Sequence, residues 1–68
     1  MTPEDRAARK ALLSLARWAR KEAREELAAA RFAEAAGEYI VAQYRMSDYE
    51  TFLSVASEAN RRARRIGK

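Results

Sequence analysis

The 68-residue sequence contains no cysteine and no histidine. Without cysteine it can form no disulfide and offers no thiol nucleophile, so a reducing, cytoplasmic setting is the simpler expectation. Without histidine it also lacks the commonest general base and a principal ligand of transition metals. These absences predict that the protein is not an enzyme and carries no metal or other cofactor.

The acidic residues do not change that expectation. Glu22, Glu25 and Glu26 share one face of a helix, but a di-metal helix would pair glutamate with histidine three residues later. Arginine and lysine at positions 17, 20, 21 and 24 neutralise these acids, which is typical of a solvated helix face. The two glycines stand too far apart to form a phosphate-binding loop.

Long apolar runs are also missing. No stretch approaches the roughly twenty residues needed to cross a bilayer, and no signal-peptide hydrophobic region follows Met1. The composition is 49% hydrophobic and 35% charged, which is typical of a folded helical protein. About half of the hydrophobic residues are alanines. We therefore expect one all-α domain over residues 1–68, a small helical bundle with a limited core and no membrane association.

Helix boundary signals divide this domain. Thr2 is a suitable N-cap and Pro3 a suitable first helical residue. Ser47 with Glu50 has the spacing of a second capping box. The sequence thus predicts a long N-terminal helix, a tight turn at Met46–Asp48, and an antiparallel C-terminal helix that ends near Arg65, before Gly67.

Apolar periodicity leaves the path of the long helix open. One stripe runs through the first 44 residues at helical spacing, and it predicts an internal side that includes Val41 and Tyr44. A single helix, a helix broken near Gly37, and a hidden turn in residues 22–28 that gives three helices all fit this stripe. A single unbroken helix would extend beyond the C-terminal helix and leave Leu12 and Leu15 uncovered. A second copy of the chain could cover them, so this path would favour a homodimer. The C-terminal helix has its own seam: Tyr49, Phe52, Ala56, Ala59, Ala63 and Ile66.

A second apolar line lies roughly opposite the first and begins at Ala28. It predicts a surface for a partner protein, because a two-helix fold cannot cover both sides of one helix. Its principal residues are Phe32, Ala35, Tyr39 and Ala42. Trp18 has two interpretations, either the sealed edge of the core, which we favour, or an exposed anchor of the same binding surface.

The C-terminal end, residues 61–68, is strongly basic. Arg61, Arg62, Arg64 and Arg65 could neutralise phosphates, so nucleic-acid binding is the alternative function. The same cations would complement the negative end of a helix dipole without any binding role.

The sequence resembles known classes of small helical protein in its general composition, but it carries no family motif. The stretch MSDYETFLSVASEA is weakly similar to the second helix of a tetratricopeptide repeat, but no repeat period follows. The TPED opening and the Ala/Arg/Glu filling resemble de novo designed helical mini-binders. Small phage or bacterial inhibitors, of the antitoxin or anti-defence kind, share this style. Both resemblances imply a non-catalytic module that binds or inhibits a partner protein.

Overall fold

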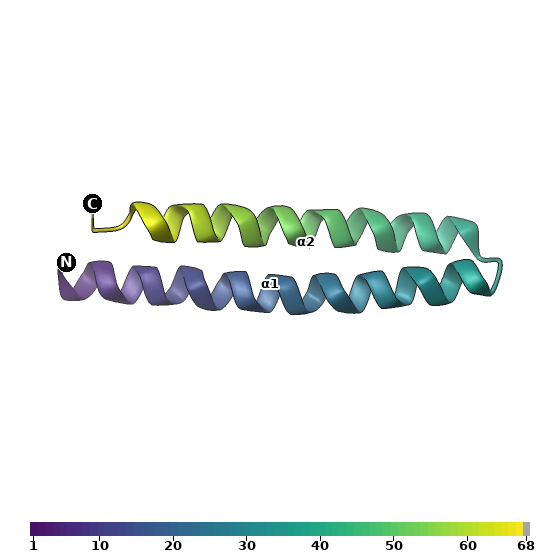
Figure 1. Cartoon of the computed structure of the whole chain (residues 1–68), viewed down its shortest axis with the longest axis horizontal. Coiled ribbons are helices and arrows are strands. Elements are labelled where there is room, and N and C mark those ends of the chain that lie inside the picture. Colours follow the sequence, from purple (N-terminus) through teal and green to yellow (C-terminus); the bar gives the residue numbers. More distant parts are fainter. Residues whose placement is uncertain (68) are drawn as a thin grey trace.

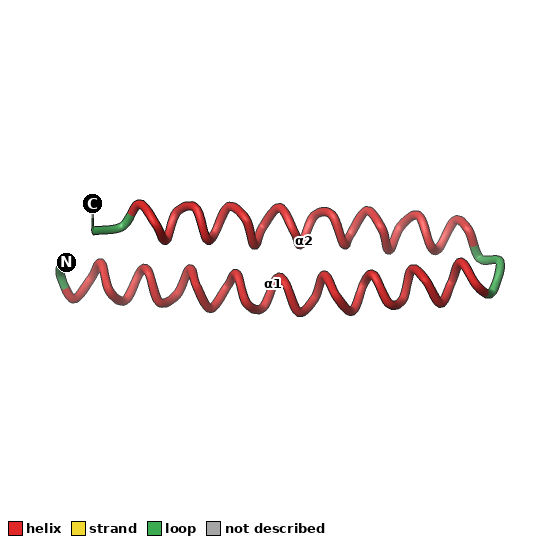
Figure 2. Tube along the Cα trace, viewed as in Figure 1, coloured by secondary structure: helices red, strands yellow, loops and turns green. Residues whose placement is uncertain are grey.

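The computed structural model describes residues 1–67 and consists of two antiparallel helices joined by a short turn (Figure 1). Helix α1 spans Pro3–Ala35 and helix α2 spans Tyr39–Arg65. No strand occurs in these 67 residues, as Figure 2 shows. The Cα atoms fill a rod of 52 × 13 × 10 Å. The expected all-α class and antiparallel C-terminal helix are confirmed.

The first helix begins where its sequence signals place it. The Thr2 Oγ1 accepts a hydrogen bond from the Asp5 backbone N–H at 3.1 Å, and the Asp5 carboxylate accepts one from the Thr2 N–H at 3.4 Å. Pro3 follows, at a position whose N–H would have no partner within the helix. Two of the free donors at this end are therefore satisfied locally.

The chain reverses at Gly37. Its φ of +78° is in the left-handed region that glycine adopts without a Cβ clash. The Gly37 N–H donates to the Glu34 carbonyl at 3.0 Å, and the Glu38 N–H donates to the Ala33 carbonyl at 2.8 Å. These two bonds are those of a Schellman motif, which ends α1. Of the three paths left open by the sequence, the break near Gly37 is the observed one, and no turn interrupts residues 22–28.

The turn predicted at Met46–Asp48 is wrong, because α2 passes through these residues without interruption. Ser47 lies inside the helix, where its carbonyl accepts a hydrogen bond from the Thr51 hydroxyl at 3.0 Å. The actual start of α2, at Glu38, has no side-chain cap. A capping box satisfies the free N–H groups at a helix start, and inside a helix these N–H groups already have backbone partners. Residues 46–48 include no glycine to favour a turn, whereas Gly37 provides one.

The core between the helices is made of alanine. All nine buried hydrophobic residues among positions 1–67 are alanines: Ala16, Ala19, Ala23, Ala30, Ala33, Ala42, Ala56, Ala59 and Ala63. Their spacings of three, four and seven residues in α1, and of three, four and fourteen in α2, form one stripe on each helix. The predicted C-terminal seam is confirmed, since each of its six residues is buried or half-buried.

The predicted internal side of the N-terminal segment is only partly correct. Ala19, Ala23, Ala30 and Ala33 are buried, but Val41 is 44% exposed and Tyr44 is 71% exposed. The stripe was extended across Gly37 as if the helix continued, and the reversal there points Val41 and Tyr44 outward.

Helix α2 also accompanies α1 along nearly its whole length. Leu12 and Leu15, expected to outreach their partner helix, instead border a groove shared with Val55 and Ala59. The argument for a dimer based on an overhanging helix is therefore wrong.

Candidate functional site

Large apolar side chains lie outside this alanine seam. Ten of them are exposed among the described residues: Met1, Leu15, Trp18, Phe32, Tyr39, Ile40, Val41, Tyr44, Met46 and Leu53. Alanine is small enough to let two helices approach closely, but a thin two-helix rod has no further layer to cover bulky neighbours. The exposed residues are the candidates for a binding role.

One long side of the hairpin, the tryptophan face, holds five of the ten. Leu15 of α1 and Val55 of α2 border the same groove. Trp18 follows Leu15 by one helical turn, and Phe32 follows Trp18 by two heptads, which keeps both on this side. Val41 precedes Val55 by two heptads, and Tyr44 follows Val41 by one turn. The apolar residues of the tryptophan face are Leu15, Trp18, Phe32, Val41, Tyr44 and Val55. By the same heptad spacing, Glu22, Glu25 and Asp48 lie between them on this side.

Trp18 lies at the edge of the core and is also half-exposed. Its ring meets the Phe52 ring edge-to-face, with centroids 5.5 Å apart and planes at 84°. Its residue surface nevertheless remains 51% exposed. Phe52 is half-buried and lies on the α2 seam, so Trp18 closes the edge of the core and presents its other side outward.

The loop end of the tryptophan face is the most exposed part. Phe32 is 78% exposed and Tyr44 is 71% exposed. An aromatic ring so poorly covered contributes little to the stability of the hairpin, and such rings are enriched where proteins bind one another.

The residues of the predicted second apolar line do not stay together. Tyr39 borders a groove with Glu34 and Met46, and Glu34 is two residues from Phe32, about 160–200° around the helix. Tyr39 therefore lies on the opposite side from Phe32. Ala42 is only 7% exposed because it packs in the seam, and Ala35 is exposed near the end of α1. The line assumed one continuous helix, which Gly37 interrupts.

The side that carries Tyr39 is basic, a feature that the sequence analysis overlooked. Six cations follow one side of α1 at spacings of three, four and seven residues: Arg6, Lys10, Arg17, Arg20, Arg24 and Arg31. Arg6, Lys10 and Arg17 border one hollow with Leu13, and the other three recur at helical spacing from them. We call these six residues, with Leu13, Leu27 and Tyr39, the arginine face. In residues 1–67, none of the six cations forms an ion pair. Spacing alone could have revealed this stripe.

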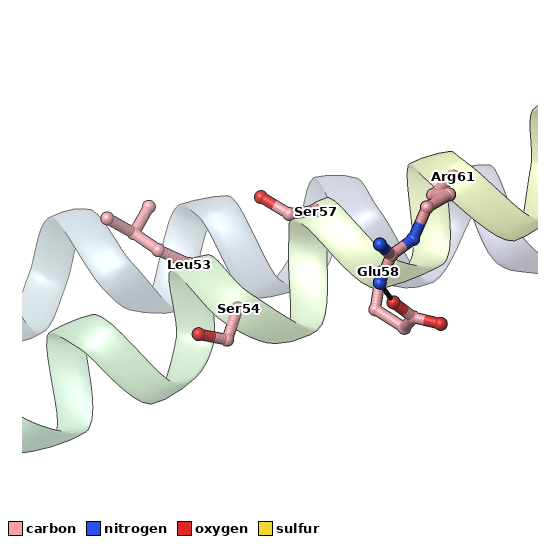
Figure 3. Close-up of a pocket in the computed structure, with 5 residues that line it drawn as sticks. All are labelled: Leu53, Ser54, Ser57, Glu58 and Arg61. Carbon is pink, nitrogen blue, oxygen red and sulfur yellow. Dashed lines mark ion pairs between the residues drawn. The ribbon is translucent and has the colours of Figure 1, made fainter.

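The C-terminal arginines, by contrast, are partly neutralised. Arg61 and Arg62 both form ion pairs with Glu58, the second with a distance of 3.0 Å between Nε and Oε1. Figure 3 shows the Glu58–Arg61 pair beside a shallow hollow on α2. Leu53, Ser54 and Ser57 complete that hollow, and all five lining side chains come from α2 alone. It contains no convergent set of reactive groups.

Charge also divides the rod along its length. The open half, which contains both chain ends (residues 1–20 and 52–67), has nine basic and three acidic residues, net +6. The loop half, residues 21–51, has four basic and seven acidic residues, net −3. The rod is therefore positive at its open end and negative at its loop end.

No group of three acidic side chains within residues 1–67 converges in a way that could hold a metal ion. Neither of the two helices is long and apolar enough to cross a membrane.

Comparison with protein-family models, with characterised proteins and with solved structures found no significant match for this chain.

Proposed function

We propose that this protein is a non-catalytic interaction module, a binder or inhibitor type of protein, that docks a protein partner on its tryptophan face. The observation that carries the proposal is the exposure of Phe32 and Tyr44, at 78% and 71%, on the same side of the hairpin as the half-exposed Trp18. Burial of a large aromatic side chain contributes roughly 1.5–3 kcal/mol, which a partner would supply here. Binding energy usually concentrates in a few such anchors.

A site-specific photocrosslinking experiment tests this function. A photoreactive phenylalanine analogue at position 32, introduced into the chain in its source cells, is expected to form covalent protein adducts. The matched control carries the analogue at Ala28, which is also exposed on α1 but lies away from the seam. Adducts that form at position 32 and disappear on Trp18→Glu support the proposal. The same faint labelling at both positions would overturn it.

The arginine face supports a second candidate, sequence-independent binding of nucleic acid. Its six cations spread over 26 residues of α1, and the helical rise of 1.5 Å per residue makes this about 38 Å. Cations that have no acidic partner can neutralise phosphates along a duplex. The C-terminal Arg64 and Arg65 would extend this positive surface, whereas Arg61 and Arg62 are engaged by Glu58.

A further inference from the structure

The isolated hairpin exposes more surface than a compact protein of its mass. Its accessible area is 5176 Å², whereas a compact 7.7 kDa chain would expose about 4,300 Å². Its radius of gyration is 15.6 Å, against about 11 Å for a compact domain of 68 residues. The excess area, roughly 900 Å², is close to the 800 Å² or so that each partner buries in a stable interface.

We propose that a second copy of this chain covers the tryptophan face, so that two hairpins pack antiparallel into a four-helix bundle. This inference rests on the proposed function and names the partner that the same face takes. Three features of the hairpin support a second copy rather than an unrelated protein.

The first feature is the charge along the rod. In an antiparallel pair the open half of one copy, net +6 over all its sides, lies along the loop half of the other, net −3. Four of these cations belong to the arginine face and point away from the interface, whereas Arg62 and Arg65 border it. A parallel pair would set the two positive halves side by side. Complementary potentials of this kind select orientation and partner.

The second feature is the location of Trp18 and Phe52. Phe52 is the central residue of α2, and Trp18 is one residue from the centre of α1. A two-fold axis brings a residue on the axis against its own copy. The aromatic pair at mid-length would therefore meet its equivalent and form the centre of the interface.

The third feature is complementary shape at the two ends of the face. Its loop end has the bulky Phe32 and Tyr44, whereas its open end has the small Ala11 and Ala8, one and two turns before Leu15. In an antiparallel copy with Trp18 and Phe52 at the axis, Tyr44, eight residues from Phe52, comes to the height of these alanines, which are seven and ten residues from Trp18. Phe32, fourteen residues from Trp18, lies farther out, at the height of Glu4. Arg62 and Arg65, at the same end, would then lie beside the rings, where a guanidinium is favourable.

Sedimentation equilibrium at micromolar concentration tests the inference, with a helicity measurement on every sample to show that each variant is folded. The parent chain is expected to sediment at twice its 7.7 kDa mass. Trp18→Glu and Phe32→Glu should weaken the dimer by at least roughly thirtyfold, because each replaces a central or bulky anchor by a charge. Tyr39→Glu on the arginine face is the matched control and should remain dimeric.

The single tryptophan supplies a second readout. Trp18 is half-exposed in the hairpin, so its fluorescence emission should move to shorter wavelength as concentration rises through dimerisation. The cysteine-free chain also accepts a unique spin label at Glu38→Cys. In the antiparallel dimer the two labels lie near opposite ends of the 52 Å rod, and in a parallel dimer they adjoin.

Each other outcome overturns the inference. A parent chain that stays monomeric removes the second copy, and adducts between position 32 and a different protein would then leave the proposed function intact. If Tyr39→Glu dissociates the dimer and Trp18→Glu does not, the interface is on the arginine face. A label distance under half the rod's length would make the pair parallel.

Discussion

Glu26 of α1 and Arg45 of α2 form an ion pair across the seam of the hairpin. One guanidinium nitrogen of Arg45, Nη1, lies 3.2 Å from both carboxylate oxygens of Glu26. The Glu26 side chain is 16% exposed and that of Arg45 is 47% exposed. Among residues 1–67 it is the ion pair that joins the two helices. Because a row of alanines packs in similar ways after a shift of one turn, this pair helps to define which residues of α1 and α2 face each other.

The first prediction concerns this ion pair. A double-mutant cycle with Glu26→Ala and Arg45→Ala should give a favourable coupling energy of about 0.5–1 kcal/mol, since Arg45 is partly solvated. Urea denaturation provides the free energies of unfolding. Glu25→Ala with Arg45→Ala is the control cycle and should show no coupling. Equal coupling in both cycles would mean that the cross-helix contact has no specific energy.

The second prediction concerns the reversal. Gly37→Ala should lower the free energy of unfolding by about 1–2 kcal/mol, because an L-residue is strained in the left-handed region. A Cβ at this position would meet no atom within 4 Å, so backbone strain is the whole effect. Gly67→Ala is the control, with φ of +85° at the end of the chain. It should change stability much less, because helix ends fray. Thermal melts that rank the two variants in the opposite order would contradict this account of the turn.

The third prediction concerns the seam. Ala19 is fully buried, and Ala19→Leu should destabilise the hairpin by about 1–3 kcal/mol because no space exists for the larger side chain. The same substitution at the exposed Ala28 should stay within about 0.5 kcal/mol of the parent. Urea titration of both variants gives the comparison. A leucine tolerated equally at both positions would show that the helices separate easily.

The fourth prediction distinguishes the two aromatic positions by concentration. At high dilution, Phe32→Ala and Tyr39→Ala should each change the free energy of unfolding by no more than about 0.5 kcal/mol, because both rings are exposed. At concentrations that favour the dimer, only Phe32→Ala should lower the melting temperature. A large loss in the dilute Phe32→Ala variant would show that its ring packs within the hairpin.

The fifth prediction concerns the alternative function. If the parent chain binds duplex nucleic acid, replacing Arg17, Arg20 and Arg24 by Gln should flatten the log–log salt dependence by up to about 0.9 per lost phosphate contact. Replacing Arg61 and Arg62 should have a smaller effect, since Glu58 already engages both. Fluorescence anisotropy at several salt concentrations measures the slopes. Absence of binding by the parent at low salt would exclude this function.

The sequence was informative about local structure and less so about the turn. The helix boundaries predicted from Thr2, Pro3 and Gly67 were correct because these residues act on neighbouring backbone atoms. The seam from Tyr49 to Ile66 was correct because a single helix keeps its period. Ser47 and Glu50 were misleading, since a capping box inside a helix can leave the helix unbroken. The choice between Gly37 and Met46–Asp48 depended on how well two alanine rows pack together, which local patterns do not record.

The prediction of the candidate surface was limited in the same way, because it too depended on where the chain reverses. Phe32 and Trp18 were identified by their size, and both are exposed or partly exposed. Their grouping with Tyr39 and Ala42 required a helix that continues through Gly37. Once the chain reverses there, residues a few positions apart point to opposite sides of the rod. The arginine face was missed for a different reason, because its six cations are dispersed over residues 6–31, whereas the C-terminal arginines form a dense cluster in the sequence.

The alanine seam also has a consequence for how stability depends on temperature. Alanine has no side-chain rotamers to lose on folding, so its burial carries almost no side-chain entropy cost. It also removes little apolar surface from water, and apolar surface is what makes the heat capacity of unfolding large. The heat capacity change on unfolding the isolated hairpin should therefore be smaller than the typical value of about 12–15 cal/mol/K per residue. Its free energy of unfolding should change only slowly on cooling, and calorimetry should record a broad, shallow transition whose heat capacity increment grows when two copies associate.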